Sequence, residues 1–237
     1  MNQFTGLSII IPTVDETRGV GETVEIISEI CDKDDIAEIL IIHSRNSSES
    51  HVGALCSLAA RFSEWHVSVL VQPGTGLGDA LFYGCSICKG SHFLMIGADR
   101  EDDVFIVKKM LSLAKSHPNM IITTSRKLEK DEANEYSVCK RVVRDIFCFV
   151  IGIFYGFRQT DITYVYQITP KEYFDCDFFE VDHSSFVLEL GLLAEIKKIP
   201  LMEIPTRISR RKEGSSHSGI KYYAGFVRTG LKLLKKR

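Results

Sequence analysis

The sequence has no apolar segment long enough to cross a lipid bilayer. A spanning helix needs roughly 18 or more apolar residues in a row, and the longest run that is both uncharged and apolar, at residues 146–157, is interrupted by Gly152 and Gly156. Such a run predicts a buried helix or an apolar surface patch that faces a membrane. Residues 1–6 also lack the basic start of a secretory signal, so we expect a cytoplasmic location, with any membrane contact peripheral and on the inner face.

Cysteine occurs seven times, but not in a pattern that binds zinc. Cys85 and Cys88 form a single CxxC pair, without a second pair or histidines at ligand spacing. An odd number of cysteines in a chain without a secretory signal indicates reduced thiols in the cytosol. We therefore expect Cys85 and Cys88 to be core residues on a helix.

The glycine-rich stretch at residues 72–80 matches neither of the common nucleotide-binding fingerprints. A dinucleotide fingerprint would need glycine where Asp79 or Leu81 stands, and no Gly-Lys-Ser/Thr of a P-loop follows. A dehydrogenase is therefore a remote alternative. The glycines allow two interpretations: backbone contact with a phosphate at a helix N-terminus, or a turn with close packing of Gly78 and Ala80.

The net charge of −2 conceals an uneven distribution. Residues 207–237 contain ten Lys or Arg and one acid, Glu213, which amounts to +9; the rest of the chain has 19 basic and 30 acidic residues, which amounts to −11. A basic end of this kind predicts contact with phosphates or an anionic membrane. The acidic body does not suit broad nucleic-acid binding, so we expect no nucleic-acid partner.

Strand and helix signals alternate through the first hundred residues of this 237-residue chain. Apolar, β-branched runs predict strands at residues 7–12, 37–42, 67–71 and 92–96, and helical spacing predicts helices at 22–31, 51–62 and 79–88. Pro12 is expected to end the first strand, with a loop at residues 13–21. This alternation predicts an α/β fold with a central, mainly parallel sheet and helices on both faces.

A cluster of acids follows the predicted strand that ends at Ile96. After Gly97 and Ala98, four carboxylates stand close together: Asp99, Glu101, Asp102 and Asp103. In open α/β sheets ligands bind beyond the carboxyl ends of the strands, so these acids are placed for a divalent cation and a phosphorylated ligand. The alternative is a solvated turn and the first turn of a helix, where the macrodipole favours acids.

Three motifs in this order carry a resemblance to a known family. They are Leu-Ser-Ile-Ile-Ile-Pro-Thr from Leu7 with Glu16 after it, Gly-Leu-Gly-Asp-Ala from Gly76 with Gly84, and Gly-Ala-Asp-Arg-Glu from Gly97. Together they resemble the inverting family 2 glycosyltransferases of GT-A fold, and most of all the dolichyl-phosphate mannose synthase and polyprenyl-phosphate sugar transferase branch.

The resemblance implies specific roles for the residues of the first half. The nucleotide-binding positions would be Pro12, Thr13, Glu16, His43, Gly76 and Asp99. Asp99 and Glu101 would hold Mg²⁺ or Mn²⁺ on the diphosphate, where a divalent cation acts as a Lewis acid on the leaving group. Asp99 would thus be catalytic as well.

Matching segments continue in the second half of the chain. Ser125 and Arg126 end a predicted strand at residues 121–125, Arg141 lies in a predicted helix at 138–152, and Asp161 opens Asp-Ile-Thr-Tyr-Val-Tyr. Farther on come a predicted helix at 186–197 and a closing loop with Arg211, Gly214, Ser216 and His217. The resemblance implies that Arg126, Arg141, Arg211 and Ser216 bind the acceptor or a phosphate, because arginine recognises phosphate through two parallel hydrogen bonds.

Asp161 and Arg211 are the remaining candidates for catalysis. With a phosphate acceptor, which needs little deprotonation, Asp161 would orient the acceptor; with a hydroxyl acceptor it would be the candidate base. The alternative for Asp161 is a turn or cap residue after Gln159 and Thr160.

The function implied by the resemblance is transfer of a sugar, with inversion, from a nucleotide sugar to an acceptor, in particular a polyprenyl or dolichyl phosphate at the cytoplasmic membrane face. Several positions depart from the family. His43 and Ser44 replace the paired Asp that reads the base, Gly97 replaces the first Asp of the metal motif, and His217 replaces a Lys. These changes motivate an alternative, a degenerate homologue that binds a nucleotide sugar or a protein partner without turnover. The retention of Asp99, Glu101, Arg211 and Gly214 argues against it.

We expect one catalytic domain at residues 1–206, with a nucleotide-binding half (1–103) and an acceptor half (104–206), followed by a basic loop and an amphipathic helix at 207–237. The tail repeats apolar residues at helical spacing: Ile220, Tyr223, Val227, Leu231 and Leu234. This pattern predicts a basic helix on an anionic membrane, or a helix docked on the body. No heptad repeat indicates an oligomeric state.

Overall fold

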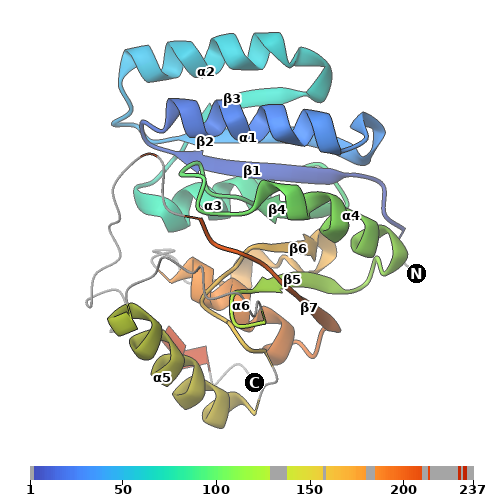
Figure 1. Cartoon of the computed structure of the whole chain (residues 1–237), viewed down its shortest axis with the longest axis vertical. Helices are drawn as coiled ribbons and strands as arrows, with labels where there is room; N and C mark the ends of the chain where they lie inside the picture. The colour runs from blue at the N-terminus through green and yellow to red at the C-terminus, as the bar shows by residue number, and fades with distance from the viewer. Residues whose placement is uncertain are drawn as a thin grey trace.

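A seven-stranded sheet in the order β3-β2-β1-β4-β6-β5-β7 forms the centre of the protein (Figure 1). The computed structural model describes residues 3–128, 138–156, 159–179, 185–209, 213, 229–230 and 232–233, without the side chains of 138–141, 143 and 144. The strands are β1 (Leu7–Thr13), β2 (Ile36–His43), β3 (Val67–Val71), β4 (His92–Met95), β5 (Ile121–Ser125), β6 (Gln167–Pro170) and β7 (Leu201–Pro205).

The sheet is mainly parallel, as predicted. Strand β1 pairs in parallel with β2 and β4, β2 with β3, and β5 with β7. The exception is β6, which runs antiparallel between β4 and β5. Because β4 belongs to the expected nucleotide-binding half and β6 to the expected acceptor half, one sheet continues through both halves.

Six main helices cover the two faces of this sheet. They are α1 (Thr17–Ile30), α2 (Glu49–Arg61), α3 (Gly76–Ile87), α4 (Val107–Ser116), α5 (Val138–Tyr155) and α6 (Phe186–Ile196). Successive residues of β1 point to opposite faces, since side chains alternate along a strand. Ile9 and Ile11 pack in a core with residues of α1, α2 and α4, whereas Ile10 packs in a second core with residues of α3, α5 and α6.

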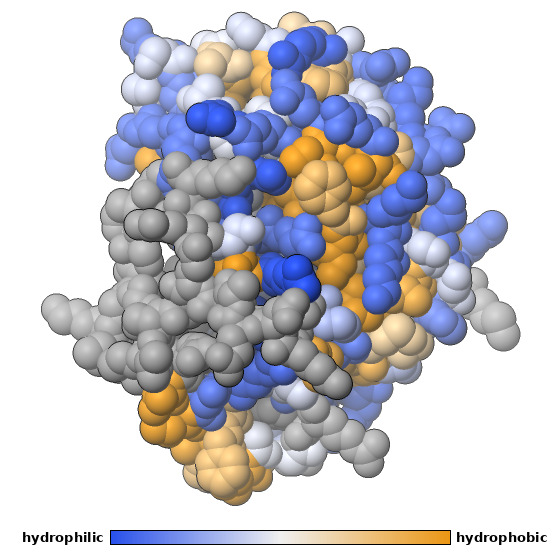
Figure 2. Space-filling model, viewed as in Figure 1, coloured by the Kyte–Doolittle hydropathy of each residue, from blue (hydrophilic) through white to orange (hydrophobic). Residues whose placement is uncertain are grey.

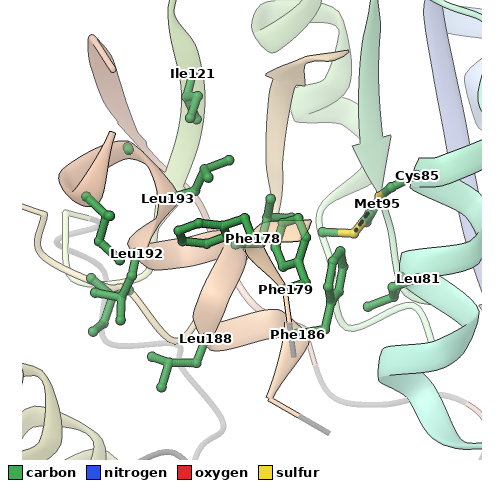
Figure 3. Packing of buried hydrophobic residues seen from close by; sticks show 14 of the residues in the cluster. Leu81, Cys85, Met95, Ile121, Phe178, Phe179, Phe186, Leu188, Leu192 and Leu193 are labelled. Atoms are coloured by element: carbon green, nitrogen blue, oxygen red, sulfur yellow. Dashed lines mark hydrogen bonds between the residues drawn. The ribbon is translucent and has the colours of Figure 1, made fainter. Parts of the chain in front are cut away.

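The second core is rich in aromatic side chains. Figure 3 shows Phe178, Phe179 and the α6 residue Phe186 in one group that faces the α3 residues Leu81 and Cys85. The Phe179 and Phe186 ring centroids are 4.8 Å apart. Cys85 and Cys88 are both buried, as predicted, and burial raises the pKa of each thiol, to about 11 for Cys88.

Three details of the fold differ from the sequence-based prediction. Helix α1 begins at Thr17, inside the loop that we expected at residues 13–21. Strand β1 continues past Pro12, because the Thr13 carbonyl accepts a hydrogen bond from the Ser44 amide (3.0 Å). Helix α4 and the four-residue strand β6 were not predicted; β6 has a single large apolar side chain, Ile168, which is too weak a pattern to detect.

Helix α1 starts early because of a close contact that sequence does not reveal. Gly19 packs directly on the turn after β4, where a Cβ built on this residue would lie 1.8 Å from the Ala98 carbonyl oxygen. We interpreted the glycines near this point as loop residues, whereas Gly19 is buried inside the helix. None of the helices in the described part of the chain is both long enough and apolar enough to span a membrane.

Candidate active site

The candidate site lies where β1, β2 and β4 end at the same edge of the sheet. Thr13, the last residue of β1, is in register with His43, the last residue of β2. The acidic turn follows β4, whose hydrogen bonding to β1 continues as the Ile96 amide donates to the Ile10 carbonyl (3.0 Å). The fold therefore brings Pro12, Thr13, His43 and the acidic turn together, as expected for parallel strands.

Glu16 folds back onto the loop that follows β1. Its Oε2 atom accepts hydrogen bonds from the Thr13 hydroxyl (3.0 Å), the Val14 amide (2.8 Å) and the Asp15 amide (3.2 Å). Burial opposes ionisation of this carboxyl, but these hydrogen bonds outweigh it and lower its pKa. An ionised Glu16 therefore fixes the shape of the loop at neutral pH.

His51 belongs to the same network and was missed by the sequence analysis. It is 3% exposed, with Nε2 3.3 Å from the Thr13 Oγ1 and Nδ1 2.6 Å from the Thr17 Oγ1. Since the Thr13 hydroxyl donates to Glu16, Nε2 is the protonated nitrogen, and Nδ1 accepts from Thr17. Burial lowers the pKa of His51. A neutral His51 thus joins the end of β1 to the start of α1.

Hydrogen bonds connect the segment after β2 to the glycine-rich loop. His43 donates from Nδ1 to the Ser44 carbonyl (2.9 Å). Arg45, which the sequence analysis did not single out, donates from Nε to the Gln72 carbonyl (3.2 Å) and from Nη2 to the Pro73 carbonyl. These contacts hold the loop that precedes α3 against the candidate site.

Within the glycine-rich loop, Gly76 begins helix α3 with a φ of 87°, a conformation that favours glycine. The Asp79 Oδ2 accepts from the Thr75 amide (2.8 Å), and Ala80 is buried. A Cβ on Gly84 would lie 2.5 Å from the Ile10 Cγ2 atom, so the helix packs closely on β1. The packing interpretation of this loop is therefore confirmed for Ala80, and phosphate contact through Gly76 stays a prediction.

The four acids after β4 have different structural roles. The Asp102 Oδ2 accepts from the Gly97 amide (2.9 Å) and its Oδ1 accepts from the Tyr164 hydroxyl (2.6 Å). Burial raises the pKa of Asp102, and these two hydrogen bonds oppose the rise. Asp103 caps the following 3₁₀ turn through the Phe105 amide (3.1 Å). Asp102 and Asp103 therefore shape the turn.

Asp99 and Glu101 are the pair that could hold a metal. The Asp99 Oδ1 accepts from the Glu101 amide (3.1 Å), and both residues are partly exposed. Between them, Arg100 has a φ of 63°, an uncommon conformation for a non-glycine residue, and its Nε lies 3.3 Å from the Glu22 Oε2 on α1. The turn therefore contacts α1 in two places, by close packing at Gly19 and by an ion pair at Glu22.

Within the described residues, no group of three or more His, Cys, Asp or Glu side chains is placed to hold a metal ion. A cation at Asp99 and Glu101 would therefore complete its shell with water and with oxygen atoms of a ligand. Magnesium commonly binds in this way, with one or two carboxylates and the phosphates of a substrate. The donor set fits Mg²⁺ or Mn²⁺ bound together with a diphosphate.

The chain returns to this site after β7. The Ser209 amide donates to the Glu101 carbonyl (3.0 Å), and Ile208 forms an antiparallel bridge with Asp102. The Glu213 Oε2 accepts from the Gly19 amide in α1 (2.7 Å). Arg211 stands between Ser209 and Glu213 in the sequence but, like Ser216, lies outside the described residues, so the roles of both stay predictions.

Arg126 and Asp161 bind each other in the interior. Arg126 donates from Nε to the Asp161 Oδ2 (2.6 Å) and from Nη2 to the Asp161 Oδ1 (2.8 Å), and both side chains are buried. The guanidinium also contacts the Thr163 hydroxyl (3.1 Å) and lies 4.6 Å from the centre of the Tyr164 ring. This arrangement orients the end of β5 and the following loop; direct roles in acceptor binding or proton transfer stay predictions.

Tyr164 connects this buried pair to the acidic turn, because the same side chain that lies under Arg126 donates to Asp102. On the other side of the loop, the Thr160 amide donates to the Glu203 carboxylate on β7 (2.9 Å). Burial raises the pKa of Glu203, and the contacts with Thr160 oppose the rise. Arg141 lies in helix α5, but its side chain is outside the described residues.

The mainly parallel sheet, with carboxylates after its central strand, has the GT-A fold, a class of nucleotide-sugar transferase folds. The model of the family "Glycosyl transferase family 2" matches residues 8–181, which is more than half of the chain. The chain belongs to glycosyl transferase family 2. No curated protein matches it by sequence.

Solved structures share this fold at low sequence identity. Mannosyl-3-phosphoglycerate synthase from Rubrobacter xylanophilus is 16% identical, with a TM-score of 0.66 over 97% of this chain and 73% of that one. Glucosyl-3-phosphoglycerate synthase from Mycobacterium tuberculosis, in complex with Mn²⁺, UDP-glucose and glycerol 3-phosphate, is 13% identical, with a TM-score of 0.63 over 98% of this chain and 80% of that one. The same enzyme with Mg²⁺ and UDP has a TM-score of 0.65, at 13% identity over 98% of this chain and 79% of that one.

Proposed function

We propose that this protein transfers a sugar from a nucleoside diphosphate sugar to an acceptor, with inversion at the anomeric carbon. The observation that carries the proposal is the meeting of three segments at one edge of the sheet: the loop after β1, the end of β2 and the acidic turn after β4. The shared fold adds support, because glucosyl-3-phosphoglycerate synthase has been crystallised with UDP-glucose and Mn²⁺.

In this proposal Asp99 and Glu101 would hold Mg²⁺ or Mn²⁺, and the bound cation would supply Lewis-acid stabilisation of the diphosphate leaving group. Thr13 and His43 stand next to each other at the ends of β1 and β2, where the nucleoside would bind. Glu16 and His51 hold the Thr13 loop in place through hydrogen bonds. Arg211 supplies positive charge to the phosphates.

The alternative is a homologue that binds a nucleotide sugar or a protein partner without transfer. The reason to consider it is Gly97, which lacks the carboxylate of the family's metal motif. The family has an Asp at this position, but a Cβ on Gly97 would lie 3.0 Å from the Asp99 Oδ1 and 3.3 Å from the Asp102 Oδ2. A third carboxylate would be crowded and repelled there. In this chain Asp102 already holds the Gly97 amide, so the turn forms without that Asp. We therefore favour an active transferase.

For the acceptor, we propose a molecule that carries a phosphate, and specifically a polyprenyl or dolichyl phosphate at the cytoplasmic face of a membrane. The charge of +9 on residues 207–237 suits a phosphate and an anionic membrane. The M. tuberculosis enzyme was crystallised with glycerol 3-phosphate, a molecule that also carries a phosphate group. Transfer assays with a polyprenyl phosphate and with 3-phosphoglycerate, run side by side, distinguish a lipid acceptor from a soluble one.

The first test is a thermal-shift screen of nucleoside diphosphates and their sugars, with and without Mg²⁺ or Mn²⁺. A ligand that binds only the folded state at about 100 times its Kd stabilises a protein by about 2.7 kcal/mol. We expect a metal-dependent rise in Tm with one nucleotide, and Asp99→Asn should abolish the metal-dependent part. Asp34→Asn, an exposed acid in the turn before β2, is the matched control and should respond like the wild type.

Two results would count against the proposal. Equal metal-dependent shifts in Asp99→Asn and in the wild type would place the cation elsewhere. An absence of any shift with every nucleotide would contradict the transferase and support a role in binding a protein partner.

A further inference from the structure

Helix α5 has an outer face of large apolar side chains that are exposed to solvent. Its inner side packs on the body through four buried residues, Phe147, Cys148, Ile151 and Tyr155. Its outer side exposes six large hydrophobic residues: Val142, Ile146, Phe149, Val150, Ile153 and Phe154. A surface helix of a soluble protein normally places charged and polar residues on this side.

The exposed residues form one continuous stripe. Their spacing of three and four positions places them on the same face of the helix, where Phe149 is 70% exposed and Ile153 is 66% exposed. Across the described residues, twelve large hydrophobic side chains are exposed, and six of these twelve lie on α5. Figure 2 shows hydrophobic surface gathered on this part of the molecule, at the lower left of the view.

The basic end of the chain is attached to the inner side of α5. The Tyr155 hydroxyl donates to the Gly230 carbonyl (2.6 Å), and a Cβ on Gly230 would lie 2.8 Å from the Ile151 Cδ1. Leu233 is 1% exposed and belongs to the same core as the inner side of α5. Residues 229–230 and 232–233 are helical, and they are therefore docked on the body next to α5.

The sequence around this attachment is strongly cationic. From residue 214 to the end there is no acid, and five basic residues stand within a few positions of the docked residues in the sequence: Arg228, Lys232, Lys235, Lys236 and Arg237. Lys232 is exposed. On α5 itself, the Asp145 Oδ1 lies 3.0 Å from the Lys127 Nζ, so the charge of this acid is balanced.

We propose that the outer face of α5 inserts into the surface of an anionic phospholipid bilayer, with the basic chain end in contact with the lipid headgroups. An apolar stripe next to positive charge is the combination that binds such a surface, because acyl chains accept the stripe and acidic headgroups attract the cations. A second copy of this chain fits less well. A symmetric contact between two α5 faces would bring two basic chain ends together.

This proposal is independent of the transferase activity. It places the membrane contact on the apolar run at residues 146–157, one of two segments for which the sequence predicted such a contact; the other is a stripe on the basic tail. The predicted stripe was Ile220, Tyr223, Val227, Leu231 and Leu234. These five residues lie outside the described residues, so their role stays a prediction. The described tail residues that are buried are Thr229, Gly230 and Leu233. The docked tail contributes charge, and α5 contributes the inserted apolar surface.

The test measures co-sedimentation of the full chain with vesicles of phosphatidylcholine alone and with vesicles that also contain phosphatidylserine. We expect binding only to the anionic vesicles, weakened by high salt. Phe149→Glu should reduce the affinity by about tenfold or more, because it removes apolar area and adds a charge at the membrane surface. Phe105→Glu is the matched control: Phe105 is also an exposed phenylalanine (60%) but lies after the acidic turn, and this variant should bind like the wild type.

Insertion is measured separately with Phe149→Trp. The chain has one tryptophan, Trp65, which is 7% exposed and provides the background emission. We expect the emission of the introduced tryptophan to shift to the blue on anionic vesicles and to be quenched by brominated lipids.

The proposal would be overturned if Phe149→Glu bound anionic vesicles with the affinity of the wild type, or if Phe149→Trp bound them without quenching of the introduced tryptophan. A wild-type dimer in solution that Phe149→Glu dissociates would also overturn it, since a second copy would then cover the face. None of these assays needs a nucleotide, so their failure leaves the transferase proposal standing.

Discussion

The half of the sheet built from β1 to β4 packs mainly apolar side chains on both faces and has a buried polar pair, Ser8 with Glu38, whereas the half built from β5 to β7 contains a buried ion pair. Six of the seven residues of β1 are buried and most are aliphatic. In the other half, Arg126 pairs with Asp161, and Thr160 binds Glu203. The first half follows the local hydrophobic pattern, and the second is organised by contacts between residues far apart in the sequence.

The largest effect is expected where the second half loses a polar pair. Removing one partner of a buried ion pair leaves an uncompensated charge and costs roughly 3–5 kcal/mol. Asp161→Ala should therefore lower the free energy of unfolding by about this amount, measured by urea denaturation.

The double variant Arg126→Met/Asp161→Leu is the control for this prediction. It removes both charges and leaves no unpaired one in the interior. It should therefore recover much of the lost free energy of unfolding if the role of the pair is mainly structural. If Asp161→Ala unfolds with the midpoint and slope of the wild type, the second half does not depend on this pair.

A smaller effect is expected at the close contact between α1 and the acidic turn. Gly19→Ala would place a Cβ 1.8 Å from the Ala98 carbonyl. Overpacking of this kind typically costs about 1–3 kcal/mol. We expect a lower Tm together with a loss of the nucleotide-induced thermal shift, because the turn carries Asp99 and Glu101.

Gly21→Ala is the matched control in the same helix, since a Cβ there meets nothing within 4 Å. Alanine favours the helix over glycine by up to about 1 kcal/mol, so this variant should be as stable as the wild type or more stable. Equal responses of the two variants would show that the contact with Ala98 does not shape the site.

The smallest effect concerns histidine in the first half. Burial lowers the pKa of His51 at the site and of His92 at the opposite end of the sheet. A histidine with a lowered pKa is neutral when folded, so the unfolded chain binds more protons below the ordinary value of about 6.5. The stability that each residue contributes is therefore present above this pH and lost as the pH falls.

Both His51→Gln and His92→Gln should accordingly flatten the fall in stability between neutral and mildly acidic pH. Only His51→Gln should also weaken the nucleotide-induced shift, because His51 contacts Thr13 at the candidate site, whereas His92 contacts the Pro118 carbonyl. A nucleotide response reduced equally in both variants would argue against a specific role for His51.

The site was partly predictable for the same reason as the fold. Thr13, His43, Asp99 and Glu101 stand at the ends of strands that the apolar pattern predicts, and parallel strands bring their carboxyl ends together. His51 and Arg45 gave no such signal. Each acts through hydrogen bonds to residues about thirty or more positions away along the chain, and no spacing rule links those positions.

The sequence by itself determined the α/β class, the parallel direction of the first strands, and the acids that stand at the edge of the sheet where we expect ligands to bind. Periodicity is a short-range signal, and burial of apolar side chains follows it directly. Tertiary structure alone decided that Asp102 shapes the turn, that Arg126 and Asp161 bind each other, and that α5 keeps an apolar face exposed. These outcomes depend on which distant residues meet, and that is determined only when the whole sheet has formed.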